Sequence, residues 1–264
     1  MSNVVKIVIA VVVILGLAVA GWYLLRGDSA EESLPAPEPT ATVAPPPPTP
    51  DLASQLSERL RGVTLATSDA AIRQLAAELS ARPELAKWLA NDDLVRRFVA
   101  AVDNVADGVN PKTHLDFLRP SGAFQVEDQG GRITIDPRSW ARYDHIAGVV
   151  NSLDTAGTVT LYRELEPLMV GAHREIARPG TSFRQRLDQA LDRLLAVPVP
   201  STPVEVQPKV VTYTYVDPDL ESLSPAERQF LRMGPANVRM IQAKLRDLRA
   251  ALAAAEANPP AESE

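Results

Sequence analysis

The chain contains no cysteine among its 264 residues. A disulfide framework, a thiol nucleophile and a cysteine-ligated zinc or iron–sulfur site are therefore excluded. Aromatic residues make up only 5% of the chain. Alanine and leucine must then supply much of any core, and this balance favours helices over sheets. The composition predicts a mainly α protein without cysteine chemistry.

Basic runs are also missing, and the net charge is −6, which argues against nucleic-acid binding as a main role. The sequence has no phosphate-binding loop, no Gly-x-Ser-x-Gly motif and no His-Glu-x-x-His motif. The three histidines, His114, His145 and His173, lack metal-ligand spacing. We therefore predict no catalytic residue, metal ligand or cofactor. Enzymatic activity stays unassigned, and the sequence favours a protein without one.

One long apolar run is present, "IVIAVVVILGLAVAGWYLL" at residues 7–25. As a helix it would span about 28 Å, close to the ~30 Å hydrocarbon thickness of a bilayer. Trp22 and Tyr23 lie near its end, where interfacial aromatic residues gather. A signal peptide cleaved after Ala20 is the alternative, although "WYLL" continues the apolar run past that position. We predict residues 1–26 as a membrane anchor, or else a signal peptide.

Proline dominates the next segment, which contains "SLPAPEPTATVAPPPPTP" and has nothing to bury. Residues 27–50 are predicted to be a disordered linker with a reach of up to ~75 Å. A proline-rich recognition ligand is the alternative interpretation. The short leader places the N-terminus inside the cell. The segment 51–253 is then a helical extracytoplasmic domain, and residues 254–264 are a disordered tail.

Apolar residues recur at helical spacing through most of residues 51–253, for example over 94–105, 183–194 and 238–252. The alternation in "FQVEDQGGRITID" instead predicts a small β-hairpin around Gly130 and Gly131. "VEVQPKVVTYTYVDP" predicts an extended C-terminal strand segment, which Pro208 restricts to an edge. Pro167 predicts a kink or break in the helix that starts at Asp154. The predicted domain is one helical globular unit with these two small β segments.

The stretch "NDDLVRRFVAAVDNVADG", residues 91–108, carries the first candidate site. Asn91 suits an N-cap, and Asp92 and Asp93 in a first turn would complement the helix dipole. Arg96 and Arg97 flank the apolar stripe, and Asp93 could pair with Arg97 at i, i+4. A plain helix start explains these residues, and the alternative is an exposed recognition surface formed by both acids and both arginines.

A second candidate surface combines Trp140, Arg142 and Tyr143. Aromatic and guanidinium groups are enriched at binding hot spots. The alternative is that Trp140 and Tyr143 belong to the core. Neither candidate surface carries a predicted catalytic group.

Several strings together resemble one known family: "LAKWLANDDLVRRFVAAVDNVADG", "YRELEPLM", "VQPKV" and "LRMGPANVRMIQAKLRDLR". The chain is similar to a proteobacterial, membrane-anchored family built on a domain of unknown function, number 3014, over roughly Asp69 to Leu252. The resemblance implies an envelope protein of a Gram-negative bacterium and carries over no catalytic residue. At His173 the family pattern has tyrosine, which argues against histidine-centred chemistry.

Three functions remain open. We expect a noncatalytic binding or scaffold protein, held at the bacterial inner membrane by residues 7–25 in a single pass, with its domain in the periplasm. Its partner would be an unknown envelope protein or glycan. The first alternative is a cryptic envelope glycan or lipid hydrolase. The second is an assembly factor that forms a homo-oligomer through its last helix.

Overall fold

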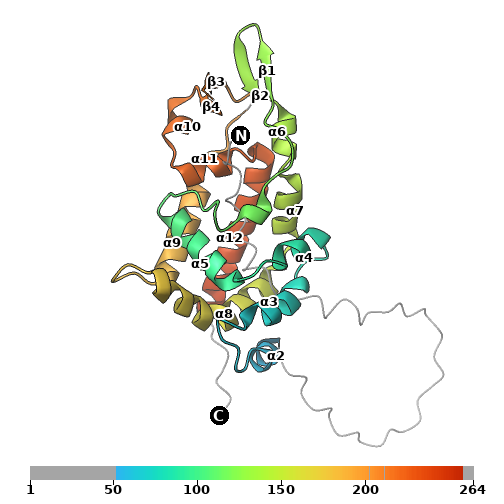
Figure 1. The fold of residues 1–264 in the computed structure, drawn as a ribbon, viewed down its shortest axis with the longest axis vertical. Helices are drawn as coiled ribbons and strands as arrows, with labels where there is room; N and C mark the ends of the chain where they lie inside the picture. The colour runs from blue at the N-terminus through green and yellow to red at the C-terminus, as the bar shows by residue number, and fades with distance from the viewer. Residues whose placement is uncertain (1–51, 202, 211, 258–264) are drawn as a thin grey trace, which may run out of the picture.

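The computed structural model describes residues 52–201, 203–210 and 212–257 (Figure 1). The predicted anchor (1–26), the linker (27–50) and the end of the tail therefore lie outside the described residues. Within the described part of the chain, no helix is both long enough and apolar enough to span a bilayer. The account that follows concerns the folded domain.

The domain is mainly helical, as predicted, with two antiparallel hairpins. Its helices are α2 (Leu52–Arg59), α3 (Ser68–Ala77), α4 (Pro83–Leu89), α5 (Leu94–Ala106), α6 (Pro137–Ala141), α7 (Asp144–Ser152), α8 (Thr155–Ile176), α9 (Phe183–Ala196), α10 (Pro218–Ser222), α11 (Pro225–Leu231) and α12 (Pro235–Ala257), with one 3₁₀ turn, η2 (Asp116–Leu118). The hairpins pair β1 (Val126–Gln129) with β2 (Arg132–Ile135) and β3 (Val206–Lys209) with β4 (Thr212–Tyr215).

Helix α12 lies at the centre of the fold (Figure 1). It packs against α7, α8 and α9, while α5 packs against α8 and α9. Its predicted apolar stripe is buried in the domain and is at most 4% exposed; the stripe comprises Val238, Ile241, Leu245, Leu248 and Leu252. This stripe is used within the chain, so it does not offer the surface through which the predicted oligomer would form.

Polar side chains of α12 satisfy the carbonyl groups at the ends of other helices. Gln242 is buried, and its Nε2 donates to the carbonyls of Leu194 (3.0 Å) and Val197 (2.9 Å) at the end of α9. The Nζ of Lys244 donates to the Leu153 carbonyl at the end of α7 (2.7 Å). Helix ends leave carbonyls without intrahelical partners. Helix α12 therefore supplies hydrogen bonds as well as apolar contacts.

The first predicted hairpin is confirmed. Val126 pairs with Ile135 and Gln129 with Arg132, which leaves Gly130 and Gly131 as the turn. Both glycines have positive φ angles, 68° and 94°, a region that glycine enters without steric cost. The hairpin projects from one end of the elongated domain, whereas α2 lies at the other end (Figure 1).

The predicted C-terminal strand segment is extended, as expected, and it folds back on itself as a second hairpin. Val206 pairs with Tyr215 and Lys209 with Thr212. The turn contains Val210, which is fully exposed and has a φ of 48°. A β-branched residue rarely adopts a positive φ, so the sequence gives no turn signal at this position.

The two hairpins contact each other. The backbone N–H of Ile135 donates to the Val204 carbonyl (3.0 Å), and Thr134 forms an isolated bridge with Glu205. Glu205 also forms an ion pair with Arg132. The two hairpins are thus joined to each other at one end of the domain.

Of the kink or break predicted at Pro167, the break is absent, because α8 runs without interruption from Thr155 to Ile176. Asp154 caps its start, and its side chain accepts from the N–H of Gly157. Leu165 and Met169, on either side of the proline, are fully buried. Proline removes its own N–H donor, and its ring crowds the carbonyl of the residue four positions earlier. Packing across this position holds the helix together in spite of that loss.

Candidate functional site

Helix α5 starts two residues later than its sequence predicts. It begins at Leu94, and Asp93 precedes it with a φ of 57° and no side-chain cap hydrogen bond. Asn91 does not cap this helix either, because its Nδ2 donates to the Trp88 carbonyl of α4 (2.7 Å). The predicted cap at Asn91 is therefore wrong, and Asp92 and Asp93 do not lie in the first turn.

The cap comes from another helix. Asp69, in the first turn of α3, accepts from the backbone N–H of Asp93 (2.7 Å) and from that of Leu94 (3.0 Å). One carboxylate thus satisfies two donors that a helix start leaves open. Sequence reasoning missed Asp69 because 24 residues separate it from Asp93, and no local motif marks such a cap.

Arg73 of α3 fixes the turn before α5. Its guanidinium donates to the carbonyls of Leu89 (2.8 Å) and Asn91 (2.9 Å) and to the carboxylate of Asp92 (2.8 Å). The side chain of Asp92 is nevertheless 88% exposed. Exposed ion pairs contribute little to stability. The Asp92 carboxylate is therefore an accessory contact, whereas the carbonyls of the turn hold Arg73 in place.

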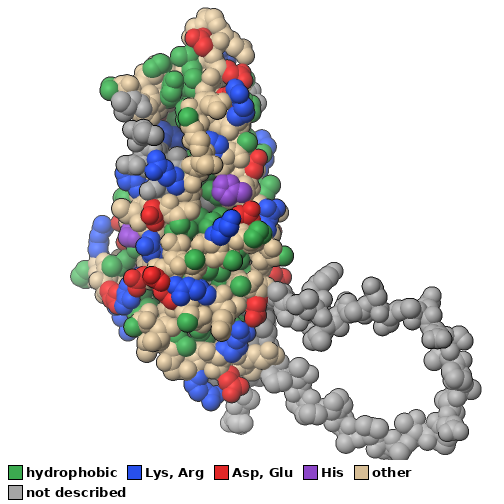
Figure 2. Space-filling view, turned by 45° about the vertical axis from the view of Figure 1, so that its right-hand side comes forward, with side chains coloured by type: hydrophobic (Ala, Val, Ile, Leu, Met, Phe, Trp, Pro, Cys, Tyr) green, Lys and Arg blue, Asp and Glu red, His purple; other side chains and the backbone are tan. Residues whose placement is uncertain are grey.

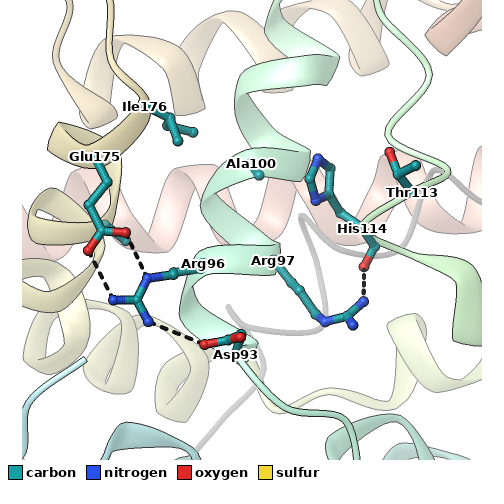
Figure 3. A pocket seen from close by; sticks show the side chains of 9 residues that line it. Asp93, Arg96, Arg97, Ala100, Thr113, His114, Glu175 and Ile176 are labelled. Atoms are coloured by element: carbon teal, nitrogen blue, oxygen red, sulfur yellow. Dashed lines mark hydrogen bonds and ion pairs between the residues drawn. The ribbon is translucent and has the colours of Figure 1, made fainter. Parts of the chain in front are cut away.

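Arg96 joins α5 to α8. Its Nε and Nη2 donate to the two carboxylate oxygens of Glu175 (2.7 and 3.0 Å), and its Nη1 donates to Asp93 (3.2 Å). The predicted Asp93–Arg97 pair is wrong, since Asp93 pairs with Arg96 instead. The hydrogen bonds from Arg96 lower the pKa of Glu175. Figure 3 shows this bidentate pair on one side of a pocket.

Arg97 contacts the loop that follows α5. Its Nε donates to the Asp92 carbonyl (2.9 Å), and its Nη1 donates to the His114 carbonyl (3.3 Å). The same Nη1 lies 3.5 Å from the carboxylate of Asp116. The two arginines thus face different elements, with Arg96 towards α8 and Arg97 towards the loop (Figure 3).

A shallow pocket of about 350 Å³ lies between these contacts. We call it the α5–α8 groove; its lining residues are Asp93, Arg96, Arg97, Ala100, Thr113, His114, Ala172, Glu175 and Ile176. Ala100 and Ala172 are the small residues of its lining, and Ile176 is 49% exposed. No described residue forms a hydrogen bond with the imidazole of His114. The groove thus combines an apolar side with an unpaired polar group.

The charges of the groove are already matched. The charges of its two arginines and two carboxylates sum to zero. Arg96 also keeps Glu175 ionised, because it lowers the pKa of that carboxyl group. A catalytic general acid needs a raised pKa instead.

Burial, and then the nearby charge of Arg97, lower the pKa of His114, so its imidazole is neutral at pH 7. A neutral imidazole can donate one hydrogen bond and accept another. The groove can therefore bind a polar group through hydrogen bonds with His114.

The second predicted surface is mostly a packing contact. Tyr143 is only 2% exposed, and Trp140 is half-buried and packs closely over Gly234. The Arg142 guanidinium lies 5.9 Å from the ring centre of Phe124 and 5.7 Å from that of Tyr143. It also donates to the carbonyls of Ser139 and Gly122, both at 3.0 Å. These residues pack the end of the domain that carries the hairpins against the helices, and none of them lines the α5–α8 groove.

His173 lies outside the groove and is 3% exposed. Its Nε2 has no hydrogen-bond partner and lies 3.9 Å from the nearer Asp103 oxygen, whose carboxylate also pairs with Arg186. Burial lowers the pKa of His173. Among the described residues, no group of three or more histidine and acidic side chains could hold a metal ion. His173 is thus part of the packing between α8, α5 and α9.

Figure 2 shows acidic and basic side chains intermixed on the visible face, without a continuous area of one sign. The described residues thus form a helical unit that carries a small, charge-balanced groove between α5 and α8. Sequence reasoning identified three of its residues, Asp93, Arg96 and Arg97. It missed His114, Thr113 and Glu175, which only the fold brings beside them.

The chain belongs to the family described as "Protein of unknown function (DUF3014)", which matches residues 94–249, more than half of the chain. This match confirms the predicted domain of unknown function, number 3014. The match starts at the first residue of α5 and ends within α12, so it includes every residue that lines the groove except Asp93. Comparisons with curated proteins and with solved structures gave no match.

Proposed function

We propose that this protein is a noncatalytic binding or scaffold domain of the bacterial cell envelope. Residues 7–25 would hold it at the inner membrane, and residues 27–50 would carry the domain into the periplasm. The uncharged apolar run and the proline-rich segment support this placement. The partner would be an envelope protein or glycan that contacts the α5–α8 groove.

The proposal rests on which polar side chains in the groove already have hydrogen-bond partners and which one does not. Its arginines and carboxylates are bonded to each other or to the backbone, so they shape the surface. The imidazole of His114 has no such bond within the described residues, and Ile176 exposes an aliphatic side chain on the α8 side of the same groove (Figure 3). An apolar lining with a small number of placed polar groups is typical of a binding site.

A photo-crosslinking residue at Ile176 of the full-length protein tests this proposal in living cells. We expect one dominant adduct with an envelope component, identified by mass spectrometry, and a weaker adduct when His114→Ala is added. Met240 on α12 provides the matched control, because it is also apolar and 38% exposed but lies outside the groove. Equal adducts at both positions, or none at Ile176, would contradict the groove as the contact site.

A further inference from the structure

One side of α12 is open to solvent, although the opposite side fills the core. We call this exposed side the outer α12 face; its residues are Ala236, Arg239, Met240, Ala243, Arg246, Asp247 and Ala250. Positions 236, 240, 243, 247 and 250 recur at alternating spacings of four and three, at which two helices pack along a shared seam. Met240 is 38% exposed here. The outer α12 face thus has the residue spacing of a helix-packing surface but is exposed.

The charged side chains of this face are left unpaired. Within the described part of the chain, Arg239, Arg246 and Asp247 form no hydrogen bond or ion pair. Arg249, at the edge of the same helix, instead pairs with Asp192 of α9 at 2.6 Å. The middle of the outer α12 face therefore carries both signs of charge that the described residues do not neutralise.

The order of residues along this face complements itself when the helix is reversed. Ala243 is the midpoint, because Arg239 lies four residues before it and Asp247 lies four residues after it. Ala236 and Ala250 lie seven residues before and after the same midpoint. In a two-fold interface, if residue i contacts residue j, then j also contacts i. An antiparallel second copy centred on Ala243 would therefore place Arg239 opposite Asp247 twice.

The charges select the antiparallel orientation. A parallel pair in register would place each residue opposite its own copy, so that Arg239 faces Arg239 and Asp247 faces Asp247, and like charges repel. In the antiparallel pair Met240 lies opposite Arg246, whose methylene stem can cover an apolar side chain while its charge stays in water. Alanine at the midpoint suits a close approach, at the short end of the usual range of about 8–10 Å between helix axes.

We propose that the outer α12 face binds a second copy of the same chain as an antiparallel helix pair centred on Ala243. Each copy contributes Arg239 to one ion pair and Asp247 to the other. None of the residues of this face lines the α5–α8 groove, so the interface goes beyond the proposed binding function and does not depend on it. It also leaves the inner apolar stripe of α12 buried in the domain.

A single cysteine at position 243 tests this pairing, because the chain has no other cysteine. The two-fold axis brings both copies of residue 243 together. Mild oxidation of cells that contain the full-length Ala243→Cys variant should therefore give a disulfide-linked dimer. Ala70→Cys is the matched control, since Ala70 is an exposed alanine on α3, which packs against α4 and α5. Equal dimer yields at both positions, or no dimer at position 243, would overturn the proposal.

Charge reversal tests the two ion pairs. Asp247→Arg sets arginine against Arg239 at both ends of the interface, so we expect the dimer yield of the Ala243→Cys chain to fall about tenfold. Adding Arg239→Asp restores opposite charges and should restore the yield. Both side chains are exposed and unpaired within the described residues, so neither change removes a contact that the domain uses. A yield that Asp247→Arg leaves unchanged, or that Arg239→Asp fails to restore, would contradict the pairing.

The photo-crosslinking residue at Met240 separates this interface from the proposed function. Met240 faces the second copy, so its adduct should be a dimer of this chain, whereas Ile176 should give an adduct with an envelope component. A dimer at Met240 without an adduct at Ile176 would support this interface and reject the groove. An adduct between Met240 and an envelope component would reject this interface.

Discussion

At the scale of single residues, Asp69 shows how a distant side chain starts a helix. We predict that Asp69→Ala destabilises the protein by about 1–2 kcal/mol, because two backbone N–H groups lose their acceptor. Asp92→Ala should stay within about 0.5 kcal/mol, since that carboxylate forms only an exposed ion pair. Chemical denaturation measures both. Equal losses would show that Asp92 supports the start of α5 as strongly as Asp69.

His114 and His173 make stability depend on pH. Burial lowers both pKa values from 6.5, so below that pH the unfolded chain binds more protons than the folded one. Their contribution to stability is complete above about pH 6.5 and declines as the pH falls towards the folded pKa values. We predict a melting temperature that decreases from about pH 6.5 to 5 in the wild type. A His114→Gln/His173→Gln variant should show a smaller decrease.

Local caps could be predicted, and distant ones could not. Asp136, Asp154 and Ser224 each accept from a backbone N–H two or three residues later, so a local sequence pattern can mark caps of this kind. Asn91 satisfies the same local pattern but donates to α4 instead. Whether Asn91 or Asp69 caps α5 depends on where α3 packs, and the residues around Asn91 do not determine that packing.

At the scale of elements, Gly234 sets how closely α11 and α12 approach α6. It has a φ of 89°, and a Cβ there would overlap the Trp140 side chain, with Cδ1 at 2.8 Å. Gly234→Ala is predicted to destabilise the protein by about 2–4 kcal/mol through backbone strain and overpacking together. Gly180→Ala separates the two causes, because Gly180 has a φ of 82° with open space around it. Urea unfolding should show a clearly smaller loss for Gly180→Ala.

The two hairpins show what turn chemistry can predict. The Gly130–Gly131 pair marks the first turn in the sequence, and the structure has it there. The second turn uses Val210 at a positive φ, which no propensity rule would select. Contacts to the first hairpin and the burial of Val206 and Tyr215 hold the second hairpin in place. Tertiary packing decides this element, so the sequence predicted only its extended conformation.

At the scale of the whole molecule, the predicted anchor can be tested by fractionation. We expect the full-length protein to stay with the membrane after an alkaline wash, and a chain that lacks residues 1–26 to be soluble. The mass of the mature protein distinguishes a retained membrane anchor from a cleaved signal peptide. A chain that begins after Ala20 would identify a cleaved signal peptide, and recovery of the full-length protein from the soluble fraction would contradict both.

The central position of α12 has a consequence for the order of folding. Residues 237–252 fill the core and supply hydrogen bonds to helix ends that lie some 50–90 residues earlier in the chain. These long-range contacts cannot form until nearly the whole domain has been synthesised, and long-range contacts also slow folding. A nascent chain that ends before α12 therefore lacks these contacts. The last helix to be made closes the domain.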